Sequence, residues 1–230
     1  MRTFLLAVSA TLALAAPAAA ATRNFGIESY TKIRVEGPFR VTVATGVPPF
    51  AKASGSPAAL DRVAIDVEGD TLVVHSQESW GGYPGTDPGP VDINVGTHDL
   101  TSAKLTGAGS VAIDRVKAQT FGLFLQGSGA AMIGDAAIDQ LSVNVVGSAS
   151  AKIAGKAGKL TALVRGVSSL DAAALSTPNA LISADGTATV DATVTDTAQV
   201  NAWGPTTIRF AGRPTCTVKV TGSATISGCR

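Results

Sequence analysis

The stretch that decides the fold is 103–113, AKLTGAGSVAI, in which apolar residues alternate up to a glycine and alternate again after it. The pattern returns as LFLQGSGAAMI at 123–133 and as VNVVGSASAKI at 143–153. In all, the pattern occurs seven times, and the central glycines are separated by 20, 20, 19, 20, 18 and 18 residues. Their anchors are Gly107, Gly127, Gly147, Gly166, Gly186, Gly204 and Gly222. A repeat of this length is the signature of a solenoid.

The chemistry around the glycine stays in phase from copy to copy. Every residue two and four positions before an anchor is apolar, and so is every residue four positions after it. Such alternation is typical of strands with one buried face. We therefore predict an all-β fold, a parallel β-helix with about seven rungs of 18–20 residues. Two strands would meet at each glycine corner and a short third side would complete the rung; a twisted antiparallel sandwich is the alternative.

The residues ahead of the regular repeat contain a degenerate copy of it. Apolar residues alternate around Gly37 between 33 and 43, which predicts one further rung. A hairpin is expected at 63–74, with its turn at 68–70. Residues 77–90 are rich in glycine and proline, and this composition predicts a long loop.

The first 21 residues read as a secretory signal. Arg2 supplies a positive start, an apolar run extends to Ala16, and small residues follow Pro17. We predict a signal peptide at 1–21 and a single solenoid domain at 22–230. Its parts are 22–99, with the degenerate rung, hairpin and loop, and 100–230, with the regular rungs. The chain is expected to be exported, to the periplasm or to the outside of the cell.

Charge and motifs argue against several classes of partner. The chain has 18 basic and 17 acidic side chains, whereas nucleic-acid binding needs a concentrated positive field. After the signal, no apolar run approaches the length of a membrane span, so we expect no membrane insertion. We expect no metal, because His75 and His98 have no His or Cys at ligand spacing. No cofactor is expected, since the glycines turn corners and open no helix.

The chain contains two cysteines, Cys216 and Cys229. An even pair in an exported chain reads first as a disulfide. One lies six residues before the last anchor and the other seven residues after it, so the bond would close the final rung. We predict that it caps the C-terminal end and stabilises it by about 3 kcal/mol.

The segment 30–43, YTKIRVEGPFRVTV, resembles the opening of bacterial exported proteins described as putative auto-transporter adhesin, head GIN domain. The segments LTGAGSV at 105–111 and LQGSG at 125–129 are similar to the recurring Gly-Ser-Gly units of that family. The resemblance covers about residues 24–228. It implies a right-handed parallel β-helix in the bacterial envelope, and it carries over no established activity and no functional residues.

Apolar residues lie on the outward side of the first strand, where a wet surface is expected. They are Phe124, Val146, Leu163 and Trp203, with Arg165 and Asp185 beside them. Such a cluster is typical of contact with a partner, a glycan or another subunit, although the loop at 77–90 could cover it instead. In that loop, Trp80 and Tyr83 could stack on sugar rings or pin the loop down.

Two carboxylates occupy the outward position five residues after their anchors. Stacked rungs would bring Asp171 and Asp191 within about 5 Å of each other, as in a retaining glycosidase. Lys152 and Arg209 share this row, and we favour a surface ladder in which they neutralise the two carboxylates. No other catalytic candidate stands out.

These observations leave two functions open. The leading hypothesis is a noncatalytic envelope protein, a β-helical scaffold that binds an unknown envelope component or glycan, or that self-associates. The alternative is a polysaccharide-active enzyme that uses a groove on the β-helix, with Asp171 and Asp191 as its catalytic candidates.

Overall fold

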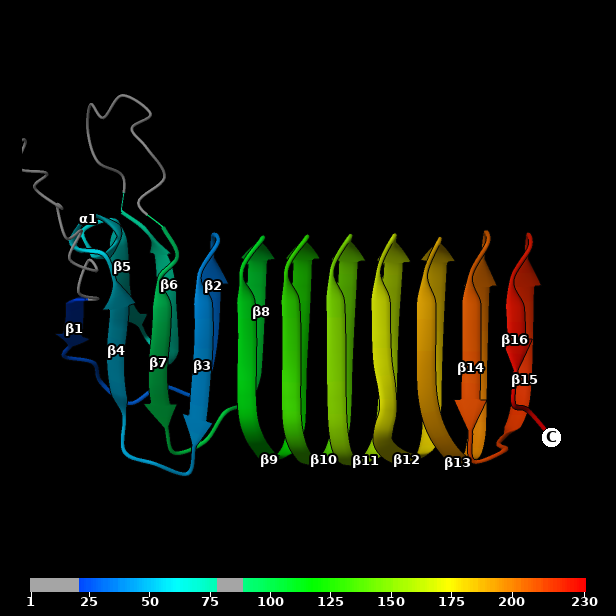
Figure 1. Cartoon of the computed structure of the whole chain (residues 1–230). Coiled ribbons are helices and arrows are strands. Elements are labelled where there is room, and N and C mark those ends of the chain that lie inside the picture. Colours follow the sequence, from blue (N-terminus) through cyan, green and yellow to red (C-terminus); the bar gives the residue numbers. More distant parts are fainter. Residues whose placement is uncertain (1–20, 78–88) are drawn as a thin grey trace, which may run out of the picture.

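The computed structural model describes residues 21–77 and 89–230, which form a parallel β-solenoid around one continuous core (Figure 1). The strands of the N-terminal part are β1 (Ala21–Phe25), β2 (Lys32–Glu36), β3 (Arg40–Thr45), β4 (Phe50–Gly55), β5 (Val63–Glu68), β6 (Thr71–Ser76) and β7 (Asp92–Thr97). The strands of the regular part are β8 (Ser102–Gly107), β9 (Ser110–Gly127), β10 (Ala130–Gly147), β11 (Ser150–Gly166), β12 (Ser169–Gly186), β13 (Thr189–Trp203), β14 (Thr207–Ala211), β15 (Thr215–Thr221) and β16 (Thr225–Ser227). A four-residue helix, α1 (Pro57–Leu60), lies between β4 and β5.

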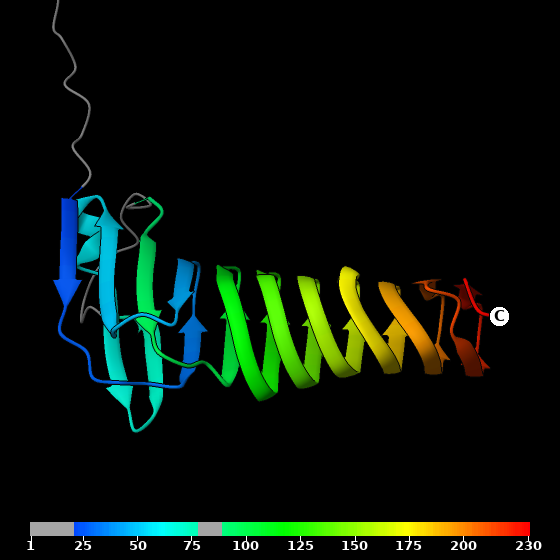
Figure 2. The ribbon, with the colours of Figure 1, turned by 90° about the horizontal axis from the view of Figure 1, so that it is seen from below.

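Each regular rung consists of long bent strands and sharp corners. Each of β9 to β12 begins just after one glycine corner and continues to the next anchor. The short third side that we expected is therefore the curved middle of a strand, seen along the lower edge of Figure 1 and from below in Figure 2. Its inward residues include Val116, Ile138 and Leu175, all buried, so the bend adds a third apolar side to the core.

The predicted glycine corners are confirmed. All seven anchors have positive φ, from 79° at Gly204 to 118° at Gly127. A Cβ at Gly147 would also lie 2.5 Å from the carbonyl oxygen of Gly127 in the preceding rung. Glycine is thus required both for the backbone conformation and for the close approach of successive rungs.

The differences in repeat length are absorbed at the bend. The register between β10 and β11 shifts between Ile133 and Ala136, and that between β12 and β13 shifts between Ala172 and Ser176. Around the corners, by contrast, equivalent positions remain paired from β9 to β12. Outward side chains near the corners therefore form straight rows across the rungs.

The N-terminal strands have a different order in space from their order in the chain. The degenerate copy around Gly37 is a rung, because β2 pairs with β8 and β3 with β9 in parallel. The next rung toward the N-terminal end is formed by β6 and β7, which come later in the sequence and pair in parallel with β2 and β3. β6 ends at Ser76 and β7 begins at Asp92, and most of the loop predicted at 77–90 between them lies outside the described residues.

Antiparallel strands close the N-terminal end of the stack. β4 runs antiparallel to β7 and β5 to β6, so the expected hairpin is confirmed, with Gly69 in its turn at φ 63°. β1 adds a further antiparallel strand beside β4. The core residues Leu60, Val63 and Ile65 are only 2%, 2% and 6% exposed. This end of the core is therefore covered.

The C-terminal end is built differently. The predicted disulfide between Cys216 and Cys229 is present, with the two Cα atoms 5.7 Å apart, and it ties β15 to the segment after β16. Val218 and Val220 of β15 nevertheless remain 44% and 43% exposed. The bond closes the last rung but leaves its inward row uncovered, so the expected cap is incomplete.

The predicted signal peptide lies outside the described residues except for Ala21, with which β1 begins. Within 21–77 and 89–230, no helix is long and apolar enough to cross a membrane.

Candidate functional site

The solenoid presents two broad faces. We call the outward surface of the strands that lead into the corners the first-strand face; it consists of β5, β6, β2, β8, the C-terminal halves of β9 to β13, and β15. The outward surface of the strands that leave the corners is the second-strand face. Parallel, in-register pairing makes each face a set of straight rows of side chains. Any ligand would therefore meet a rigid, regular surface.

A shallow depression of about 580 Å³ lies on the first-strand face over β8, β9 and β10. Its outward lining residues are Ser102, Lys104, Phe124, Gln126, Asn144 and Val146. Phe124 stands between Lys104 on one strand and Asn144 on the next, directly in register with both. The depression thus combines one aromatic ring, two neutral amides and one cation.

The ring of Phe124 lies over a glycine of its own strand. A Cβ on Gly122 would come within 2.7 Å of the ring, so the ring can pack over the backbone there only because Gly122 has no side chain. Phe124 is nevertheless 41% exposed. Phe50 on β4 has a similar arrangement over Gly96, its partner on β7, and is 42% exposed. The two rings are comparable in exposure, but Phe50 does not line this depression.

The structure separates the predicted binding residues into two groups. Phe124, Val146 and Leu163 lie on three adjacent strands: Phe124 and Leu163 share one row, with Asn144 between them, and Val146 lies in the next outward row on β10. Trp203 lies on β13, four strands away from Phe124, and is 39% exposed. The separation of Phe124 from Trp203 follows from the sequence, because the two residues precede anchors that are four repeats apart, Gly127 and Gly204.

Trp203 lies instead in the same row as the charged residues Arg165 and Asp185. It is in register with Asp185, whose Oδ2 lies 3.4 Å from Nε of Arg165. Both side chains of this ion pair are about half exposed. An exposed pair of this kind contributes little to stability, so this part of the face is polar surface with one aromatic residue.

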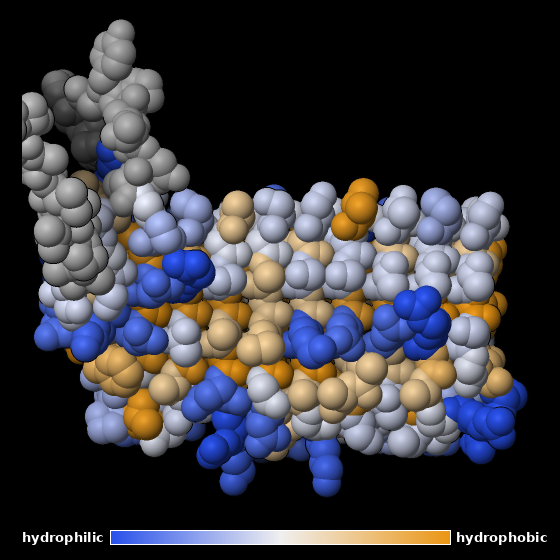
Figure 3. Space-filling view, viewed as in Figure 1, coloured by the Kyte–Doolittle hydropathy of each residue, from blue (hydrophilic) through white to orange (hydrophobic). Residues whose placement is uncertain are grey.

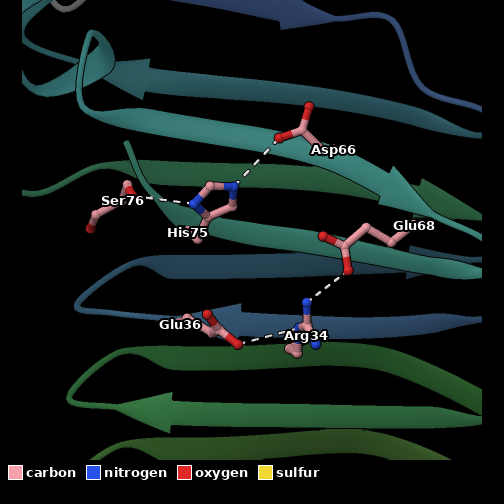
Figure 4. Close-up of polar contacts among 6 residues, drawn as sticks. All are labelled: Arg34, Glu36, Asp66, Glu68, His75 and Ser76. Carbon is pink, nitrogen blue, oxygen red and sulfur yellow. Dashed lines mark hydrogen bonds and ion pairs between the residues drawn. The ribbon is translucent and has the colours of Figure 1, made fainter. Parts of the chain in front are cut away.

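A cluster of charged residues lies on β2, β5 and β6, on the N-terminal side of β8 (Figure 4). Arg34 on β2 has Nε 3.3 Å from Glu36 and Nη2 2.9 Å from Glu68. In the same cluster, Nε2 of His75 lies 3.5 Å from Asp66. Glu36 and Glu68 neutralise the charge of Arg34, which is in register with Lys104 on β8.

Lys104 differs from its neighbour because, among the described residues, no carboxylate forms an ion pair with it. Lys104 lies on the same row as Phe124 and lines the depression beside it. Sequence reasoning missed this residue. The signal that could have found it is its position three residues before an anchor, in the row of Phe124.

The carboxylates of the alternative enzyme lie on the second-strand face, the one in view in Figure 3. Asp171 and Asp191 are directly paired in register, as the alignment predicts. Lys152 Nζ is 2.9 Å from Asp171, and Arg209 contacts both oxygens of Asp191 at 2.7 and 3.3 Å. Each carboxylate is therefore matched by its own cation, and Figure 3 shows hydrophilic patches on this face.

The electrostatics of this row do not favour acid catalysis. The hydrogen bond from Lys152, and then that from the backbone N–H of Ala173, lower the pKa of Asp171 from its ordinary value. A glycosidase needs one carboxyl with a raised pKa to donate a proton. The ion pair with Asp191 likewise raises the pKa of Arg209, so that this cation remains charged.

Trp80 and Tyr83 lie outside the described residues. In the part of the chain that the structure describes, no group of three His, Cys, Asp or Glu residues could hold a metal ion.

A family model described as "Putative auto-transporter adhesin, head GIN domain" matches residues 29–214. The chain belongs to this family. The resemblance seen at 30–43 and in the Gly-Ser-Gly units is thereby confirmed, and the adhesin description fits an exported or surface protein. Among curated proteins, no sequence matches significantly.

Solved structures share the solenoid of this head GIN domain chain. A protein from Bacteroides fragilis described as a putative adhesin aligns at 18% identity with a TM-score of 0.84, over 90% of this chain and 96% of its own. One from Parabacteroides distasonis described as a putative lipid binding protein aligns at 19% identity with a TM-score of 0.71, over 90% and 95%. A putative adhesin from Parabacteroides merdae aligns at 17% identity with a TM-score of 0.69, over 90% of this chain and 95% of its own. At these identities the likeness establishes the fold.

Proposed function

We propose that this chain is a noncatalytic, exported adhesin-type protein that binds an acidic saccharide in the depression around Phe124. The observation that carries the proposal is an exposed aromatic ring flanked in register by an amide and by a cation without a carboxylate partner among the described residues. The apolar face of a sugar ring can stack on an aromatic ring. Membership in a family described as adhesins supports a binding role.

The surrounding side chains fit a saccharide in particular. Gln126 and Asn144 each offer an amide donor and acceptor, which suits hydroxyl groups. The ammonium of Lys104 would pair with a carboxylate or sulfate on the sugar. Because the backbone beneath is a parallel sheet paired on both sides, these groups are already in place before the ligand arrives.

The test is to measure binding of neutral and acidic oligosaccharides to the protein and to Phe124→Ala by calorimetry. Loss of stacking should weaken binding about tenfold, which corresponds to ~1.4 kcal/mol. Phe50→Ala is the matched control, because it removes an equally exposed ring that also lies over a glycine. Equal affinities for both variants would show that the depression is not the site.

Lys104→Gln tests the chemical class of the ligand. The variant keeps a long polar side chain but removes the charge, so it should weaken binding of acidic saccharides and leave neutral ones unaffected. A uniform effect on both would contradict the acidic preference. Circular dichroism of each variant checks that the solenoid is intact.

A second candidate ligand is a lipid acyl chain. It is favoured by the apolar side chains of Phe124, Val146 and Leu163 on three adjacent strands, and by the relative from Parabacteroides distasonis described as lipid binding. Displacement of a fluorescent fatty acid would measure it. In that case Phe124→Ala should weaken fatty-acid binding while no oligosaccharide binds the unmodified protein.

The proposal includes export, guided by residues 1–21, to the periplasm or the cell surface. Fractionation of cells that express the whole chain distinguishes the two compartments. Recovery of the intact chain, with residues 1–21, from the cytoplasm would contradict export.

A further inference from the structure

The C-terminal end of the solenoid exposes part of its core. Val218 and Val220 on β15 are 44% and 43% exposed, whereas their partners one rung earlier, Val200 and Ala202, are 1% and 0% exposed. Within the described residues, β15 pairs only with β13 and β16 only with β14. Figures 1 and 2 show these two strands ending the stack. The end therefore combines an exposed apolar row with an unpaired sheet edge.

The unpaired edge limits what can cover this end. A free row of backbone N–H and C=O groups is satisfied by water or by another strand, and an exposed edge is a template for strand pairing. A lipid bilayer is a poor occupant, because open sheet edges do not occur in its hydrocarbon region. The occupant that satisfies both the backbone groups and the apolar row is a strand with apolar residues at alternate positions.

We propose that a second copy of this chain covers the end, with β15 pairing antiparallel to β15 and β16 to β16. Centred on Val218, this register places Val218 opposite itself and Cys216 opposite Val220, so the two inward rows meet. It places Lys219 opposite Thr217, so the two lysines do not face each other directly. The strand is thus complementary to itself in the antiparallel direction.

The N-terminal end of another copy is a weaker match. Its residues Leu60, Val63 and Ile65, on α1 and the antiparallel strand β5, are at most 6% exposed. Head-to-tail contact would therefore leave Val218 and Val220 without exposed apolar partners. It would also continue indefinitely, whereas tail-to-tail contact closes as a dimer with two-fold symmetry.

The size of the contact predicts a weak dimer. Seven residues of strand span about 23 Å, and two stacked sheets with their side chains are about 20 Å deep. Each copy would therefore bury on the order of 500 Å², about 1,000 Å² in total, at the lower limit for a specific interface. Dimerisation should accordingly depend on concentration in the micromolar range.

The symmetry has a consequence for the first-strand face. A two-fold axis perpendicular to the sheets reverses the solenoid axis but keeps both first-strand faces on the same side. The dimer would present two Phe124 depressions in one direction and bind a surface divalently, which raises the effective affinity. The dimer itself does not depend on the proposed ligand.

The experiment is sedimentation velocity of the mature chain from about 1 to about 100 μM, where a dimer of this size should form. We expect a monomer–dimer equilibrium that Val218→Lys weakens at least tenfold, because it puts two charges opposite each other in an apolar row. Lys219→Thr, which changes the outward neighbour on the same strand, should retain the dimer. A monomer at all concentrations, or head-to-tail polymers, would overturn the proposal.

A cross-link tests the register independently of affinity. Val218→Cys should form a disulfide between two copies under mild oxidation, because the residue lies opposite itself within the Cα separation that the bond requires. Thr221→Cys, at the end of the same strand, would lie far from its own copy and should remain uncross-linked. A dimer that persists without the Val218→Cys cross-link would overturn this pairing.

Discussion

Residues 100–230 and residues 21–99 build rungs with the same cross-section in different ways. In the regular part each rung follows its predecessor along the chain and a glycine turns each corner. In the N-terminal part, β6 and β7 lie nearer the N-terminal end of the solenoid than β2 and β3, although they come later in the sequence. β4 and β5 then run antiparallel to β7 and β6. Repetition extends a stack, but covering its end takes strands that do not repeat.

The largest expected effect tests whether the corners distinguish the two parts. Gly147→Ala would combine a strained φ of 104° with a Cβ 2.5 Å from the backbone of the preceding rung. We expect it to lower the free energy of unfolding by about 4 kcal/mol. Urea denaturation followed by circular dichroism measures the loss.

Gly46→Ala in the N-terminal part is the matched control. Gly46 has a φ of 73°, but a Cβ there would meet nothing within 4 Å. The expected loss is about 1 kcal/mol, from backbone strain alone. Equal losses for the two variants would mean that close approach between rungs is unimportant at the corner.

A smaller effect is expected from the disulfide, which holds one end only. Cys216→Ser combined with Cys229→Ser should destabilise the last rung by about 3 kcal/mol, because the bond closes a short loop. Hydrogen exchange should become faster in β15 and β16 and remain unchanged in β4 and β5 at the other end. Unchanged exchange in β15 would show that the strand is held by pairing with β13 alone.

The smallest effect should come from the charged rows, which occur in both parts. Asp171→Asn removes an exposed ion pair and should cost no more than about 0.5 kcal/mol at neutral pH. Lys152 lowers the pKa of Asp171, so the contribution is present above the ordinary pKa of 3.8 and is lost as the pH falls through the lowered value. The difference between the two proteins should therefore vanish in acid.

Asp92→Asn provides the N-terminal counterpart of this variant. Asp92 contacts Arg40 at 2.7 and 3.3 Å on the same face, and its replacement should have a similarly small effect. A large loss in either variant would mean that surface charges, rather than corners, hold that part together. Neither variant should change saccharide binding.

The repeating features were predictable because every regular rung has the same alternation of inward and outward residues around its glycine. Offsets from the glycine predicted which residues face inward and the register of Asp171 and Asp191, and they placed at the final rung a disulfide that the even pair of cysteines, Cys216 and Cys229, predicted. The positive φ at the anchors follows from the same alignment. The depression was predicted in part, through Phe124 but without Lys104.

The remaining features depend on contacts between distant segments. The spatial order of β6, β7, β2 and β3 is decided by pairing across long stretches of chain, which no local pattern records. The apolar residues of the bend were missed because the variable repeat length shifts their offset from the anchor: Ile138 and Ala157 pair in register, but they follow their anchors by 11 and 10 residues. The exposure of Val218 was missed because burial in a stack requires a following rung.

The in-line glycine corners make the length of this protein a quantity that evolution can change in whole units. Because each corner contacts only the corners directly before and after it, residues 148–166 could be deleted or duplicated as one block with little disturbance of the next register. Each block would move the C-terminal end by about 4.8 Å relative to the N-terminal cap. Relatives of this chain are therefore expected to differ in reach, in steps of one rung, while keeping the same cross-section.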